Sequence, residues 1–72
     1  MEYLVIYEKG ESGGYGAYAP DLPGCVAVAE TLEECRPLMK EAIEFHIAGL
    51  REDGDPIPSP TLTAEMVDVQ AA

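Results

Sequence analysis

The segment that decides the fold is residues 14–25, GYGAYAPDLPGC, in which a short β-prone run ends in a rigid turn. The two prolines of the turn fix the backbone φ angle, and the aspartate between them can bond its own backbone. The glycine before the cysteine permits a positive φ angle, which other residues rarely adopt. The segment therefore predicts a strand, a stiff connection and a second strand that begins at Cys25.

The neighbouring residues extend this pattern into a small sheet. Residues 2–8 are rich in β-branched and aromatic side chains and predict a first strand. The polar, glycine-rich residues 9–14 predict a hairpin loop. Residues 15–19 and 25–29 then supply the second and third strands of an antiparallel meander.

A helix is expected directly after the third strand. Thr31 can accept a hydrogen bond from the backbone N–H of Glu34, whose carboxylate can reach back to the N–H of Thr31. Apolar residues recur at helical spacing until about Asp53, where Gly54 supplies a C-terminal stop. Pro37 lies inside the helix and removes an internal hydrogen bond, which predicts a kink or a loosened first turn.

The remaining residues predict a connector and a fourth strand. Residues 55–60 carry proline at every second position and favour an extended backbone. Residues 61–69 alternate well enough for a final strand, and a right-handed crossover would place it beside the first strand. The predicted architecture is α+β, in the order β-β-β-α-β, with sheet order 3-2-1-4, one helix on one face, and a single domain over residues 1–72.

This succession of motifs closely resembles the HicB family of bacterial antitoxins. The resemblance is carried by Pro-Asp-Leu-Pro-Gly-Cys at residues 20–25 and Thr-Leu-Glu-Glu at residues 31–34, and it runs from Tyr3 to about Pro60. It implies a truncated ribonuclease-H-like sheet and an antitoxin that masks a small, basic, HicA-like mRNA-cleaving toxin. Many HicB proteins carry a C-terminal DNA-binding segment, but no basic helix follows the predicted fourth strand here, so DNA binding and autorepression are not expected.

The charge balance restricts the partners. There are 14 acidic and 4 basic residues, which gives a net charge of −10. Nucleic acids and anionic membranes select for Lys and Arg, so neither is expected as a direct ligand. The charge suits a basic protein partner, although solubility alone also explains it. No signal-peptide pattern or membrane-length apolar run is present, and we expect a cytoplasmic location.

The sequence offers no convincing catalytic, cofactor or metal site. The acids that two-metal nuclease chemistry could use are Glu8, Glu44 and Asp68. Glu44, however, falls away from the apolar helix stripe, and His46 has no cluster of ligands around it. Cys25 and Cys35 are expected to be free, buried thiols. We expect no enzyme, although an enzymatic or small-molecule-binding domain on the ribonuclease-H-like sheet stays open as the alternative.

Two regions are candidates for protein binding. The rigid turn would reduce the entropy lost on binding, although a plain strand connector explains it equally well. The candidate partner-binding residues are Tyr15, Tyr18, Pro20, Asp21, Leu22 and Pro23. One helix also leaves one sheet face open, where Tyr3, Tyr7 and either Tyr15 or Tyr18 are expected.

The third strand is the candidate for self-association. It is short, uncharged and β-prone, so as a sheet edge it is unprotected against pairing. A chain of this length also buries only a small core by itself. Val26 and Val28 are therefore the expected contacts of a homodimer or a higher symmetric oligomer.

Overall fold

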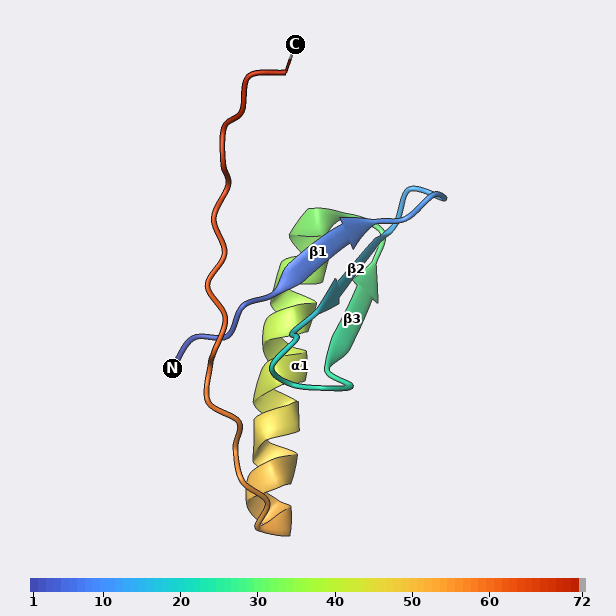
Figure 1. Cartoon of the computed structure of the whole chain (residues 1–72). Helices are drawn as coiled ribbons and strands as arrows, with labels where there is room; N and C mark the ends of the chain where they lie inside the picture. The colour runs from blue at the N-terminus through green and yellow to red at the C-terminus, as the bar shows by residue number, and fades with distance from the viewer. Residues whose placement is uncertain (72) are drawn as a thin grey trace.

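The computed structural model describes residues 1–71, in which three strands precede one long helix (Figure 1). The strands are β1 (Ile6–Lys9), β2 (Tyr15–Tyr18) and β3 (Val26–Ala29), and the helix is α1 (Leu32–Asp53). The strands form one antiparallel sheet in the order β1-β2-β3. The helix lies across one face of the sheet and contacts β2 and β3. The α+β class and the three-stranded meander are thus confirmed.

The pairing register sorts the strand side chains into two faces. One cross-strand row holds Tyr7, Ala17 and Ala27, and the neighbouring row holds Ile6, Tyr18 and Val26. Successive side chains of a strand point to opposite faces of the sheet. Ala17 is buried and Val26 is exposed, so the first row faces α1 and the second lies on the open face.

This register corrects the expected positions of the tyrosines. Tyr3, Tyr7 and Tyr15 all pack, partly buried, against the core, whereas Tyr18 is 38% exposed. Tyr7 of β1 points toward the helix, where the aromatic rings pack against a core that is made largely of alanine and cysteine. Tyr18 is therefore the tyrosine of this group that the open face presents.

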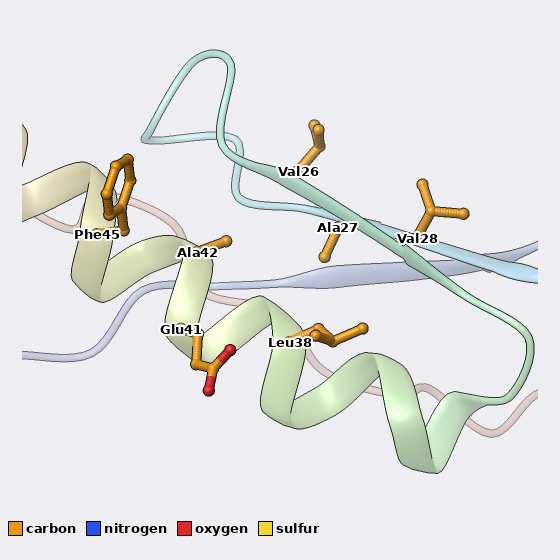
Figure 2. Close-up of a pocket in the computed structure, with 7 residues that line it drawn as sticks. All are labelled: Val26, Ala27, Val28, Leu38, Glu41, Ala42 and Phe45. Atoms are coloured by element: carbon orange, nitrogen blue, oxygen red, sulfur yellow. The ribbon is translucent and has the colours of Figure 1, made fainter.

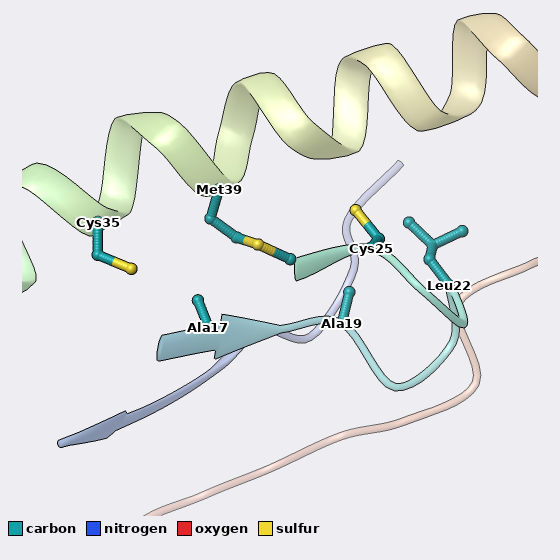
Figure 3. Close-up of a cluster of buried hydrophobic side chains, with 6 residues drawn as sticks. All are labelled: Ala17, Ala19, Leu22, Cys25, Cys35 and Met39. Atoms are coloured by element: carbon teal, nitrogen blue, oxygen red, sulfur yellow. The ribbon is translucent and has the colours of Figure 1, made fainter. Parts of the chain in front are cut away.

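The buried core is small. Its members come from β2, the turn after it and the first half of α1, and they are Ala17, Ala19, Leu22, Cys25, Cys35 and Met39 (Figure 3). Four of these six are alanine or cysteine, which remove little apolar surface from water. Leu22 and Met39 are the largest fully buried side chains, so they supply much of the hydrophobic stabilisation.

Both ends of α1 lie where the sequence predicts them. The hydroxyl of Thr31 accepts from the backbone N–H of Glu34 at 3.2 Å, and it donates to the Glu34 carboxylate at 2.9 Å. The carboxylate thus bonds the Thr31 hydroxyl instead of the expected N–H. Gly54 ends the helix in the left-handed conformation, with φ at 72°. The helix is continuous through Pro37.

The fourth strand predicted for residues 61–69 is not formed. Residues 61–71, which we call the C-terminal arm, are extended but pair with none of the three strands. Figure 1 shows the arm, in orange to red, running past the β1 side of the sheet without joining it. The arm is exposed along its whole length, so no burial offsets the entropy of ordering it as a strand. The sheet order within the described residues is accordingly 3-2-1.

The chain is less compact than a domain of its size. Its accessible surface is 5731 Å², whereas a compact monomer of 7.7 kDa exposes about 4,300 Å². Its radius of gyration is 14.3 Å, against about 11 Å for a compact chain of this length. Figure 1 shows that the arm and the second half of α1 extend beyond the short strands, which accounts for the larger surface and radius.

Candidate partner-binding surfaces

The turn between β2 and β3 is rigid because it is bonded to itself and fixed to the core. The N–H of Leu22 donates to the carbonyl of Ala19 at 2.9 Å, and the N–H of Cys25 donates to the carbonyl of Leu22 at 3.0 Å. Gly24 has the positive φ angle, 85°, that the sequence predicts. The Leu22 side chain is completely buried and holds the turn against the core.

The residues predicted to bind a partner around this turn differ in exposure. Those that reach the surface are Pro20, Asp21 and Pro23 in the turn and Tyr18 on the open face. Leu22 is fully buried and Tyr15 packs against the core. These two side chains therefore support the surface from the core side, and the other four are accessible to a partner.

Asp21 also joins the turn to the C-terminal part of the chain. Its carboxylate accepts from the backbone N–H of Thr61 at 2.8 Å and from the Thr61 hydroxyl at 2.7 Å. The bond from the Thr61 N–H, followed by the one from its hydroxyl, lowers the pKa of Asp21. The Tyr3 hydroxyl donates to the carbonyl of Pro58, which holds the connector beside the N-terminal segment. No local pattern signals these contacts, because their partners are far apart in the sequence.

A second surface is a groove between β3 and α1, shown in Figure 2, of about 500 Å³. Its lining, which we call the β3–α1 groove, consists of Val26, Ala27, Val28, Leu38, Glu41, Ala42 and Phe45. Phe45 is 82% exposed, Val28 is 75% exposed and Leu38 is 44% exposed. The sequence predicts that the two valines form an exposed sheet edge. It does not predict that Leu38 and Phe45 contribute to this surface, because neither belongs to the apolar stripe of the helix.

The outer edge of β3 carries unpaired backbone groups. The N–H of Ala19 donates to the carbonyl of Cys25 at 3.3 Å, which marks these residues as a hydrogen-bonded pair. Bonded and non-bonded pairs alternate along an antiparallel ladder. The N–H and C=O groups of Val26 and Val28 therefore point away from β2, so a further strand could bond to them.

The structure brings together no candidate set of metal ligands within residues 1–71. No group of three or more His, Cys, Asp and Glu side chains there is arranged to hold a metal ion, so Glu8, Glu44 and Asp68 do not form the cluster considered from the sequence. Cys25 and Cys35 are free and buried, and burial raises the pKa of the Cys25 thiol. Over the same residues, no helix is both long and apolar enough to cross a membrane.

Comparison with known proteins connects this geometry to a family. Residues 3–71 match the family described as the HicB-like antitoxin of bacterial toxin–antitoxin systems. The crystal structure of the N-terminal domain of Burkholderia pseudomallei antitoxin HicB is similar, with a TM-score of 0.77 and 30% identity, over 88% of this chain and 74% of that one.

Curated relatives are similar to most of this chain. A UPF0150 protein of Synechocystis is 36% identical over 67 residues, covering 93% of this chain and 85% of the relative. An uncharacterised 14.9 kDa protein of Haemophilus phage HP1 is 43% identical over 58 residues, 81% of this chain. The match spans only 43% of that phage protein. By sequence and by fold, the chain belongs to the HicB-like antitoxin family of bacterial toxin–antitoxin systems.

Proposed function

We propose that this chain is the toxin-binding module of a type II toxin–antitoxin system, and that it neutralises a small, basic, HicA-like mRNA-cleaving toxin by covering its active site. The observation that carries this proposal is the family match, which extends over residues 3–71. A toxin of that class must bind an RNA backbone and therefore needs a basic surface. The net charge of −10 on this chain favours its encounter with such a surface.

The turn and the adjacent open face form the surface that we propose for the toxin. Tyr18 and Pro23 are exposed there, and Pro20 and Asp21 are partly exposed. Leu22 fixes the turn to the core before any partner arrives, so little conformational entropy is lost when the turn binds. Tyr18 offers an aromatic surface of the kind enriched at binding hot spots.

The proposal includes a non-enzymatic role in the cytoplasm, without direct binding of nucleic acid or membrane. It also includes a homo-oligomer, for which the small core and the unpaired β3 edge are the physical reasons. A ribonuclease-H-like enzyme would require converging carboxylates, and Glu8, Glu44 and Asp68 do not converge here. Metal-dependent RNA cleavage by the pure protein, abolished by Glu8→Gln or Asp68→Asn, would favour that alternative.

Co-purification tests the proposal. The chain is co-expressed with the small basic protein encoded beside it, and we expect a stable complex in which the toxin no longer cleaves mRNA. Tyr18→Ala should weaken binding roughly tenfold or more, as truncation of an aromatic hot spot does. Phe45→Ala is the matched control, because Phe45 is an exposed aromatic residue of the β3–α1 groove instead of the open face. A complex that resists Tyr18→Ala but not Phe45→Ala would contradict the surface assignment, and failure to bind would contradict the function.

A further inference from the structure

The C-terminal arm carries apolar side chains that its own protomer leaves in solvent. Met66 is 99% exposed, Val69 is 75% exposed and Leu62 is 47% exposed. An extended, β-prone segment with exposed large hydrophobic residues and unpaired backbone groups is a template for strand pairing. Residues 61–71 contain no proline, so every N–H of the arm can take part in a sheet.

The arm would present two different sides as a strand. Leu62, Ala64 and Met66 share one side, whereas Thr63, Glu65 and Val67 share the other, because strand side chains alternate. The first side is apolar from Leu62 to Met66 and continues with Asp68 and Gln70. Such a division is typical of a strand that covers a hydrophobic layer with one side and meets solvent with the other.

The β3–α1 groove offers the matching vacant strand position. The outward N–H and C=O groups of Val26 and Val28 provide the ladder, and Leu38, Ala42 and Phe45 provide an apolar floor on α1 (Figure 2). Leu62 and Met66 would lie about 13 Å apart on an extended strand. Leu38 and Phe45 are separated by about 10 Å along the helix axis. The apolar side of the arm is therefore long enough to span this floor.

The arm of a protomer does not lie beside the β3 edge of its own sheet. Asp21 and Tyr3 hold Thr61 and Pro58, at the root of the arm. From there the arm passes the β1 edge, whereas β3 is the other edge (Figure 1). A second copy supplies an identical arm, and two copies can exchange arms reciprocally, as closed two-fold symmetry requires.

The exposed area agrees with such an exchange. The accessible surface of 5731 Å² exceeds the value for a compact monomer by roughly 1,400 Å². A stable interface of ordinary size buries about 800 Å² on each partner. Pairing of two β3 edges would leave the arm in solvent, whereas arm exchange covers both the arm and Phe45.

We propose that the C-terminal arm of each protomer adds as a fourth strand to the β3 edge of a second copy, with Leu62, Ala64 and Met66 in the β3–α1 groove. The proposal rests on the homo-oligomer included in the proposed function and is independent of toxin binding. It assigns the fourth strand of the sheet to the neighbouring chain.

Analytical ultracentrifugation of the full chain tests this proposal. We expect a dimer whose dissociation constant rises roughly tenfold or more in Met66→Lys, because a charge would be placed against the apolar side chains of Leu38 and Phe45. Val67→Lys is the matched control: Val67 is also exposed on the arm but lies on its other side, and we expect little change. Both positions are exposed in the protomer, so circular dichroism should show an unchanged fold.

Cross-linking tests the contact directly. A Phe45→Cys chain is mixed with a Met66→Cys chain under mild oxidation, and we expect a disulfide-linked heterodimer that a Val67→Cys chain forms far less. A monomer at high micromolar concentration would overturn both the homo-oligomer and the arm exchange. A dimer that is insensitive to Met66→Lys and does not cross-link would overturn the exchange alone. If Met66→Lys weakens toxin capture and leaves the dimer intact, the groove belongs to the toxin and the exchange is also overturned.

Discussion

Asp21 has two roles at the scale of the single residue. It lies on the exposed turn and its carboxylate accepts two hydrogen bonds from Thr61. Because these bonds lower its pKa in the folded state, their contribution to stability is complete above the unfolded pKa of about 3.8. That contribution is lost as the pH falls through the lowered folded value.

We therefore predict that Asp21→Ala reduces the fall in stability on acidification and loosens the root of the arm. Urea unfolding at several pH values between about 5 and 2 measures the first effect. Hydrogen exchange at the Thr61 amide, which should become faster, measures the second. Glu65→Ala removes an exposed carboxylate of the arm and serves as the control. An unchanged exchange rate at Thr61 in Asp21→Ala would contradict the role of Asp21 in holding the arm.

The turn around Leu22 is predictable from the sequence, but the position of its side chain is not. The turn and its positive φ angle at Gly24 follow from local chemistry, and both are observed. The direction of the Leu22 side chain does not follow, because its core neighbours include Cys35 and Met39 on the helix. A residue predicted on the partner surface is therefore part of the core.

At the scale of the element, α1 was predictable and the fourth strand was not. Helix ends are set by local caps, which Thr31 and Gly54 supply. A strand also needs an edge to pair with, and alternation in residues 61–69 does not identify that edge or the chain that carries it. For the same reason the sequence indicates the exposed valines of β3 but not the groove beside them.

Pro37 gives a prediction for the helix itself. It is inside α1 and cannot donate to the carbonyl of Glu33, one turn earlier. We predict that Pro37→Ala stabilises the fold by about 2 kcal/mol, since the helix preference for alanine exceeds the entropy that proline removes from the unfolded chain. Thermal unfolding followed by circular dichroism at 222 nm, the ordinary helix signal, measures the change. Arg36→Ala, at the neighbouring exposed position, should change stability by less than about 0.5 kcal/mol. A less stable Pro37→Ala chain would mean that the helix requires this proline.

At the scale of the whole molecule, the net charge affects the two proposed associations in opposite ways. Two copies each carry −10, so their mutual repulsion opposes a dimer held by apolar contacts. A basic toxin is attracted by the same charge. Added salt screens both effects.

We predict that raising NaCl from about 50 to 500 mM strengthens self-association and weakens toxin binding. Sedimentation equilibrium measures the first and calorimetry of the complex measures the second. Sucrose at matched osmolality is the control for nonelectrolyte effects. A dimer that dissociates in high salt would indicate ionic contacts in place of the apolar arm and groove.

The exposed arm also bears on the lifetime of the protein. Extended, unpaired termini are preferred sites of proteolytic cleavage, and residues 61–71 are exposed throughout in the single chain. Arms that are paired in a neighbouring copy would be protected, and the fraction of paired arms rises with protein concentration. Resistance to degradation would then increase with abundance, so a falling supply of the protein would accelerate its own removal.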